Sequence, residues 1–213
     1  MSQPDLTSRS RIAALVLAGG QASRMGGGDK PLLTVGDRTM LASVIAALDL
    51  PHTAISANGD PARFAAFGLP VLQDGPFQGQ GPLAGLLAGL DWAASIGMDA
   101  LLTAPGDTPF LPRGLADALA PAPCCVSCQG VRHHLVATWK VDCRDALRAL
   151  LSAPGPRGVG RFAATIGMRY VEFGVRAGDP FANVNTRDDL ALSRAKARMD
   201  HQAHRAGSDP AKD

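Results

Sequence analysis

The sequence predicts an α/β protein: a single domain in which helices flank a mostly parallel sheet. Short apolar runs alternate with helical patterns along most of the 213 residues, an order typical of βαβ units. The first apolar run, residues 12–17, leads directly into a glycine-rich loop, as the first strand of a nucleotide-binding sheet does. The composition, 46% hydrophobic and 19% charged, is typical of a globular domain large enough to bury a sizeable core.

The expected elements follow from the local patterns. Short apolar runs bounded by turn residues predict strands at residues 12–17, 54–57, 71–72, 100–103, 125–127, 135–139 and 169–173. Apolar residues at helical spacing predict helices at residues 40–48, 61–67, 83–95, 112–119, 144–152, 158–166 and 186–198. We expect the last two strands to be antiparallel additions to the sheet.

The two ends of the chain differ from this alternating pattern. Residues 1–10 are polar, and residues 199–213 are charged and small without an apolar period. We therefore expect a polar extension at 1–10, one domain at 11–198 and a disordered tail at 199–213.

Charge and hydropathy exclude several classes of protein. The net charge is only +2 and the basic residues are scattered, so we expect no nucleic acid partner. No apolar segment approaches the roughly 18 residues of a membrane span, and residues 1–10 lack the apolar region of a signal peptide. We therefore expect no membrane association and a cytoplasmic location.

The four cysteines are Cys124, Cys125, Cys128 and Cys143. In a cytosolic protein they are expected to be reduced thiols, here small core residues within or beside apolar runs. Cys125 and Cys128 also have the C-x-x-C spacing of redox and zinc sites, but no second pair completes such a site. We therefore predict a core role, with a thiol or zinc site as the alternative.

The glycine-rich loop, residues 17–30, predicts an anion site. Its glycines let backbone N–H groups turn toward a ligand, and Arg24 and Lys30 add positive charge. A nucleotide phosphate is the anion expected at the end of a first parallel strand. A Walker A loop is excluded because Pro31, not Ser or Thr, follows Lys30. A dinucleotide fingerprint is excluded because three of the glycines are consecutive and no helix follows at once.

Polar residues also follow the next three predicted strands. Asn58 and Asp74 follow the second and third strands; an amide suits a base edge or a ribose, and the alternative for Asn58 is a turn residue. Asp107 is a lone carboxylate after the fourth strand. Magnesium on a triphosphate needs only one or two protein carboxylates, whereas the alternative for Asp107 is a helix cap.

Two further segments combine structural and ligand signals. Gly81-Pro82 at a helix start favours a close approach of backbone to a ligand. Near the C-terminus, alternation places Asn183 and Asn185 on one face of an extended segment, and paired amides suit a polar ligand. Thr186, with an acidic residue three positions later, predicts a capping box for the last helix.

Four motifs in order resemble the molybdenum cofactor guanylyltransferases, a branch of the nucleotidyltransferase superfamily. They are G-G-x-x-x-R-M-G-G-x-D-K in the first loop, G-P-L-A-G at residues 81–85, D-x-P-F-L-P from Asp107, and F-x-N-V-N-T at residues 181–186. The resemblance covers residues 11–198. It implies a Rossmann-like fold of the nucleotide-diphospho-sugar transferase type, and transfer of GMP from GTP to the terminal phosphate of molybdopterin with release of pyrophosphate.

The resemblance also implies roles for single residues. Catalytic roles fall to Arg24, Lys30 and Asp107, with Mg²⁺ on Asp107. The nucleotide is held by Leu17, Ala18, Gly19, Lys30, Asn58, Asp74 and Asp107. The pterin side is held by Arg24, Asn183 and Asn185. The chain departs from the family pattern at Arg187, where relatives often have Pro, and at Leu135, which follows His134 where relatives commonly show His-Pro; the role of His134 therefore stays open.

Three alternatives stay open at this point. The enzyme could use CTP on molybdopterin or act on a sugar phosphate, or the chain could be a carrier that binds molybdopterin without catalysis. A carrier would not need Lys30 and Asp107 together. The expected partners are GTP and molybdopterin, with molybdoenzyme maturation proteins as further candidates.

Overall fold

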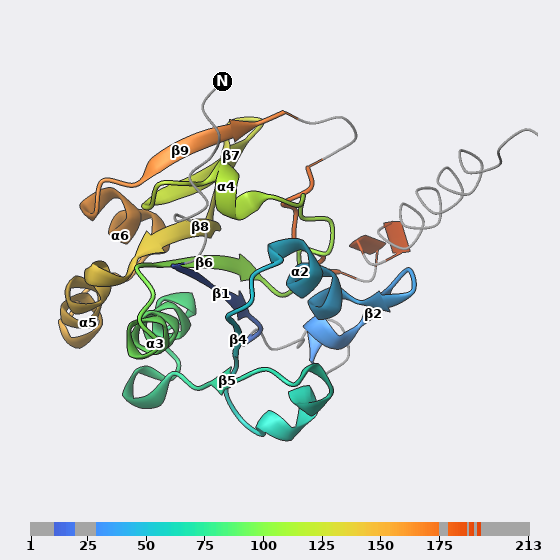
Figure 1. The fold of residues 1–213 in the computed structure, drawn as a ribbon, viewed down its shortest axis with the longest axis horizontal. Coiled ribbons are helices and arrows are strands. Elements are labelled where there is room, and N and C mark those ends of the chain that lie inside the picture. Colours follow the sequence, from blue (N-terminus) through green and yellow to red (C-terminus); the bar gives the residue numbers. More distant parts are fainter. Residues whose placement is uncertain (1–10, 20–28, 175–178, 187, 190, 193–213) are drawn as a thin grey trace, which may run out of the picture.

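The computed structural model describes residues 11–19, 29–174, 179–186, 188–189 and 191–192. A seven-stranded sheet with the order β5-β4-β1-β6-β8-β7-β9 runs through its centre (Figure 1). Its strands are β1 (Ile12–Leu17), β4 (Thr53–Ser56), β5 (Val71–Leu72), β6 (Ala100–Pro105), β7 (Cys124–Cys128), β8 (Val131–Lys140) and β9 (Arg169–Phe173). The predicted α/β class is confirmed.

The helices lie on both faces of this sheet. They are α2 (Met40–Leu48), α3 (Pro82–Ser95), α4 (Leu115–Ala118), α5 (Arg144–Ser152) and α6 (Val159–Thr165). Short 3-10 helices form at η1 (Lys30–Leu32), η2 (Pro61–Phe67), η3 (Gly75–Phe77) and η4 (Val141–Cys143). A small antiparallel pair, β2 (Thr34–Val35) and β3 (Arg38–Thr39), precedes α2 and was not predicted.

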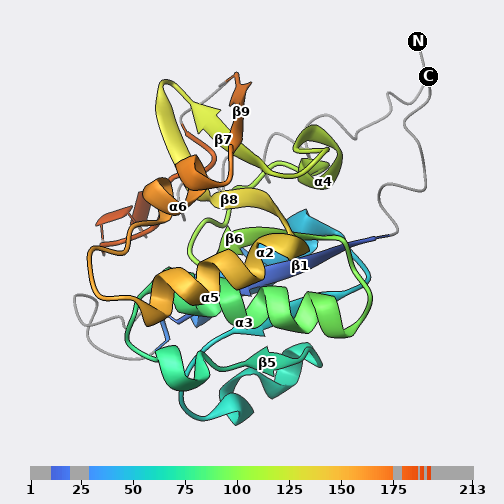
Figure 2. The same cartoon turned by 90° about the vertical axis from the view of Figure 1, so that its left-hand side faces the viewer.

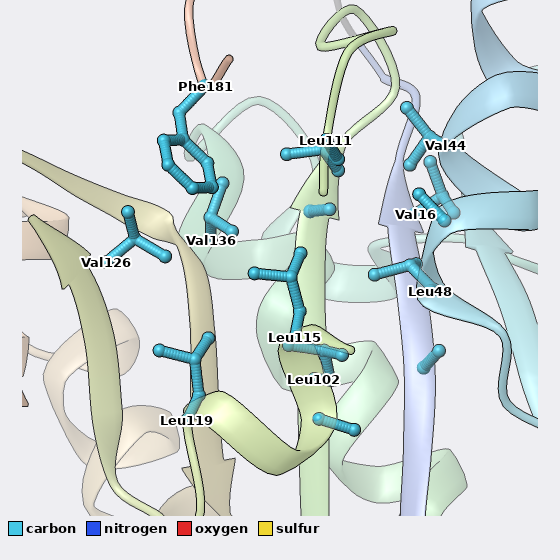
Figure 3. Packing of buried hydrophobic residues seen from close by; sticks show 14 of the residues in the cluster. Val16, Val44, Leu48, Leu102, Leu111, Leu115, Leu119, Val126, Val136 and Phe181 are labelled. Carbon is cyan, nitrogen blue, oxygen red and sulfur yellow. The ribbon is translucent and has the colours of Figure 1, made fainter. Parts of the chain in front are cut away.

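Alternate residues of β1 enter two separate cores, one on each face of the sheet. Ala14 and Val16 pack with residues of α2 and α4, a cluster that Figure 3 shows in close-up. Ala13 and Leu15 pack with residues of α3, α5 and α6 on the other face, where α3 and α5 lie side by side (Figure 2). Burial of β1 on both faces explains its continuous apolar sequence.

The strand order reverses at β1. The chain passes from β1 through α2 to β4 and β5 on one side, and α3 then carries it to β6 on the other side. Both neighbours of β1 run parallel to it, so that Leu17 pairs with Ser56 and with Pro105. The carboxyl ends of these three strands therefore share one edge, where ligands bind in open α/β sheets.

Several sequence predictions need correction. β8 is antiparallel to β6, as predicted, but β9 runs parallel to its neighbour β7. The reason is that two helices, α5 and α6, connect β8 to β9. They bring the chain back to the end of the sheet at which β8 finishes, and β9 starts from there. Residues 61–67 form a 3-10 helix rather than an α-helix, and the α4 helix is shorter than the predicted 112–119.

The predictions for the ends of the chain lie largely outside the described residues. The extension at 1–10 and the tail at 199–213 are not described, and of the helix predicted at 186–198 only residues 188, 189, 191 and 192 are described as helical. In the described part of the chain, no helix is long and apolar enough to cross a membrane.

The cysteines are buried, as predicted. All four are free thiols inside the protein, and burial raises the pKa of Cys125 and of Cys143 to about 12. Cys125 belongs to one core and Cys128 to the other, so the two thiols face opposite sides of the sheet and cannot share a metal ion. The described residues contain no cluster of three or more His, Cys, Asp or Glu that could hold a metal.

Candidate active site

A cavity of about 870 Å³ opens at the carboxyl ends of β1, β4 and β6. This volume lies in the range of small-molecule sites. Eight of the residues to which the family resemblance gives a role line it: Leu17, Ala18, Gly19, Lys30, Asn58, Asp74, Asp107 and Asn183. The structure therefore brings together residues that lie up to the length of the domain apart in the sequence, while Arg24 lies outside the described residues.

The end of β1 forms the floor of this cavity. Ala18 donates its N–H to the carbonyl of Ser56 at 2.8 Å, and Gly106 donates its N–H to the carbonyl of Leu17 at 2.9 Å. A Cβ atom on Gly106 would lie 3.1 Å from the Cβ atom of Pro31. Glycine therefore lets the loop after β6 pack tightly against the end of β1 and the start of η1.

Lys30 joins two parts of the site that are distant in sequence. Its ammonium donates to the carboxylate of Asp107 and, at 2.6 Å, to the side-chain oxygen of Asn185. The Lys30 and Asp107 side chains are only 11% and 16% exposed. Gly114, not Asp107, takes the cap position of α4, so the alternative of Asp107 as a helix cap does not hold.

Asn58 and Asp74 bind each other across the ends of β4 and β5. The amide of Asn58 donates to Asp74 Oδ2 at 2.7 Å, and its oxygen accepts the backbone N–H of Asp74 at 3.0 Å. A turn role alone therefore does not account for Asn58, because its side chain connects two loops that line the cavity.

The first turn of α3 forms another wall. Gly81 precedes the helix with φ of 75°, a left-handed value that favours glycine, and Pro82 begins the helix. Gly85 lets the helix approach the sheet, because a Cβ atom there would lie 2.3 Å from Ser56 Oγ. The N-terminus of a helix carries a partial positive charge that favours anions, so this wall suits a phosphate-bearing ligand.

Residues 179–186, the C-terminal segment, close the site on another side. Asn183 lines the cavity and Asn185 accepts from Lys30. Val184 donates its N–H to the backbone carbonyl of Asp107 at 2.9 Å, which fixes the segment beside the end of β6.

The predicted capping box after this segment is present. Asp189 accepts from the N–H groups of Asn185 and Thr186, both at 2.8 Å, and donates its own N–H to Thr186 Oγ1 at 3.0 Å. The pKa of Asp189 is lowered, mainly by the two hydrogen bonds from the backbone N–H groups of Asn185 and Thr186.

Sequence reasoning missed Arg63 and left His134 open. Arg63 lines the cavity from η2; the only local signal was a basic residue soon after Asn58. The His134 ring instead lies against Tyr170, with centroids 6.0 Å apart, and burial lowers the pKa of His134. Its neighbour Leu135, not His134, is among the described residues that line the cavity.

The chain is similar to proteins of known family. The family model of the MobA-like NTP transferase domain matches residues 14–166. The molybdenum cofactor guanylyltransferase of Acidiphilium cryptum is 52% identical over 190 residues, which are 88% of this chain and 96% of the relative. The protein of the same name from Mesorhizobium japonicum is 47% identical over 196 residues, 86% of this chain and 94% of that relative.

A solved structure agrees at the level of the fold. Molybdopterin-guanine dinucleotide biosynthesis protein A from Archaeoglobus fulgidus superposes with a TM-score of 0.66 at 20% identity, over 88% of this chain and 99% of that chain. The family model and the sequence relatives show the family: the chain belongs to the molybdenum cofactor guanylyltransferase family of MobA-like nucleotidyltransferases.

Proposed function

We propose that this nucleotidyltransferase transfers GMP from GTP to the terminal phosphate of molybdopterin. The products are molybdopterin guanine dinucleotide and pyrophosphate. The names of the relatives support this reaction. The observation that carries it is the position of Lys30, whose ammonium binds both Asp107, at the end of the central strands, and Asn185, in the C-terminal segment. A cation at this junction can serve two phosphate-bearing substrates at once.

The nucleotide is assigned to the walls formed by the strand ends. The main chain of Leu17, Ala18 and Gly19 and the Asn58–Asp74 pair would hold the guanosine, since all of them line the cavity. The first turn of α3 and Lys30 would face the triphosphate, because both favour negative charge.

Asp107 is the residue proposed to hold Mg²⁺. Its carboxylate lies in the cavity wall beside Lys30, and magnesium on a triphosphate is typically held by one or two carboxylates together with phosphate oxygens and water. A lone carboxylate therefore fits the ion. When bound, Mg²⁺ would neutralise charge on the phosphates.

Asn183 and Asn185 are assigned to the pterin side, together with Arg24. The two amides come from the C-terminal segment, which lies outside the sheet beside the end of β6, and each can donate and accept. We also propose that the reaction takes place in the cytoplasm, where the four free cysteines would stay reduced, and that molybdoenzyme maturation proteins receive the product.

The chemistry is an in-line transfer at phosphorus. A terminal phosphate oxygen of molybdopterin forms a bond to the α-phosphorus of GTP, and the bond from that phosphorus to the β-bridging oxygen breaks. The electron pair of that bond leaves with pyrophosphate, so no covalent enzyme intermediate is needed. The residues contribute by orienting the two phosphates and by offsetting their charge.

The test is pyrophosphate release by the purified protein with molybdopterin and each nucleoside triphosphate. GTP should support turnover, and CTP and ATP should not. Turnover with CTP would favour the cytidylyltransferase alternative. Tight molybdopterin binding without release of pyrophosphate from any triphosphate would favour the carrier.

A further inference from the structure

Arg63 lies on the cavity wall in a position that the proposed reaction does not use. It belongs to the 3-10 helix η2, which follows β4, and its neighbour Phe64 is fully buried in one of the cores. Phe64 therefore anchors this short helix, and the guanidinium of Arg63 also lies 4.9 Å from the centre of the Phe64 ring. The side chain of Arg63 is thus held at its base and directed into the site.

The guanidinium of Arg63 connects two loops. One nitrogen, Nη1, lies 3.0 Å from Asp29 Oδ1, and the other, Nη2, donates to the backbone carbonyl of Asn58. The Arg63 and Asp29 side chains are 31% and 21% exposed, so the pair lies in the wall of the cavity rather than on the open surface. A planar guanidinium can make two such contacts at once, whereas a lysine ammonium cannot reproduce their geometry.

Asp29 immediately precedes Lys30 and occupies the N-cap position of η1. Its carbonyl accepts the N–H of Leu32 at 2.9 Å, and Pro31 is buried. A fixed Asp29 therefore sets the point from which the Lys30 side chain reaches toward Asp107. Through Nη2, Arg63 also contacts the backbone carbonyl of Asn58, whose side-chain amide donates to Asp74.

We propose that Arg63 is a positioning residue that fixes Asp29 and thereby directs Lys30 at Asp107 and at the phosphates of the nucleotide. The catalytic part of this inference rests on the proposed function. The placement of Lys30 does not, because it can be measured without any substrate.

The first experiment measures the reactivity of Lys30 in the ligand-free protein. Limited acetylation followed by mass spectrometry gives the labelling of Lys30 relative to that of the exposed Lys140. Because Lys30 is nearly buried against Asp107, Arg63→Ala and Asp29→Asn should each raise this ratio several-fold. Arg148→Ala is the matched control: it breaks an Arg–Asp pair between α5 and α3, with distances of 2.6 and 2.8 Å to Asp91, and should leave the ratio unchanged.

The second experiment is a double-mutant cycle in turnover. Misplacing a catalytic group slows the chemical step strongly, so Arg63→Ala and Asp29→Asn should each lower kcat about tenfold, and the double variant should be no slower than either single variant. The KM for molybdopterin should stay unchanged. Arg63→Lys should recover only part of the loss.

The outcomes separate this inference from the proposed function. An unchanged Lys30 labelling ratio in Arg63→Ala, or losses in kcat that multiply in the double variant, would overturn the positioning role. If labelling changes as expected but the unaltered protein releases no pyrophosphate with GTP, the proposed reaction is wrong while the placement of Lys30 by Arg63 stands.

Discussion

The strand-end walls of the cavity and the C-terminal segment beside them are held in place by different kinds of interaction. Leu17 is the last residue of β1, and Asn58 and Asp107 follow β4 and β6. The ladders between β1, β4 and β6 hold these buried strands in register. Their positions are therefore set by the same backbone bonds that form the core. The walls that we assign to the nucleotide are in this sense formed before any ligand arrives.

The C-terminal segment lies outside the sheet and depends on a few separate anchors. Phe181 is 1% exposed and packs with Phe173, ring centroids 5.2 Å apart, in the core that Figure 3 shows. Asp179 accepts the N–H of Phe181 at 2.8 Å and lies 3.1 Å from His133 Nε2. Changes far from the ligand can therefore disturb the proposed pterin side, whereas the proposed nucleotide side should respond mainly to changes in direct contacts.

The largest effect should come from Asp107. Asp107→Ala should keep the fold, because the residue follows β6 rather than lying within it, but should lower magnesium-dependent kcat about 10²–10³-fold, as loss of a preorganised charge does elsewhere. Steady-state pyrophosphate release and the Tm together check this. Asp145→Ala, at a position 79% exposed on α5, is the control. A rate close to that of the unaltered protein would remove Asp107 from the mechanism.

Replacing Phe181, the apolar anchor of the C-terminal segment, should affect molybdopterin binding and GTP binding differently. Replacing a buried Phe by Ala lowers the free energy of unfolding by about 3–5 kcal/mol when the resulting cavity destabilises the whole core. In Phe181→Ala we expect much of that cost to appear as local release of the C-terminal segment, with weaker molybdopterin binding, near-normal GTP binding and a modest fall in Tm.

The matched control for Phe181 is Phe162→Ala, because Phe162 is 2% exposed in the core on the other face, stacked on Trp139. It should lower the Tm more than Phe181→Ala without a preference for one ligand. Equal losses of affinity for molybdopterin and for GTP in Phe181→Ala would mean that the C-terminal segment is not an independent part of the site.

A smaller effect is expected at Asn183. Losing one neutral hydrogen bond costs roughly 0.5–1.5 kcal/mol, so Asn183→Ala should weaken molybdopterin binding several-fold and leave GTP binding near normal in titration calorimetry. Asn58→Ala should do the reverse, because Asn58 holds Asp74 on the nucleotide side. Asn185→Ala should affect both ligands, since it also releases Lys30. Loss of GTP binding alone in Asn183→Ala would reverse the assignment of the two sides.

The sequence predicted best what depends on neighbours in the chain. The strand Ile12–Leu17, the helices Met40–Leu48 and Arg144–Ser152, and the polar residues after each strand all carry local signals. A pattern of seven residues cannot distinguish a repeat of 3.6 from one of 3.0, so η2 was predicted as an α-helix. The direction of β9 and the contact of Arg63 with Asp29 depend on how distant elements pack, and no local pattern encodes them.

The smallest effect concerns the cap that ends the C-terminal segment. Hydrogen bonds from Asn185 and Thr186 lower the pKa of Asp189 below its ordinary value of 3.8. A carboxylate with a lowered folded-state pKa stabilises the structure fully above its ordinary pKa, and the contribution is lost as the pH falls through the folded-state value. The amide resonances of Asn185 and Thr186 should therefore hold steady from neutral pH into mild acid and then move together below 3.8. Asp189→Asn should abolish this titration, and backbone amides that titrate at or above the ordinary value would show that the cap does not form in solution.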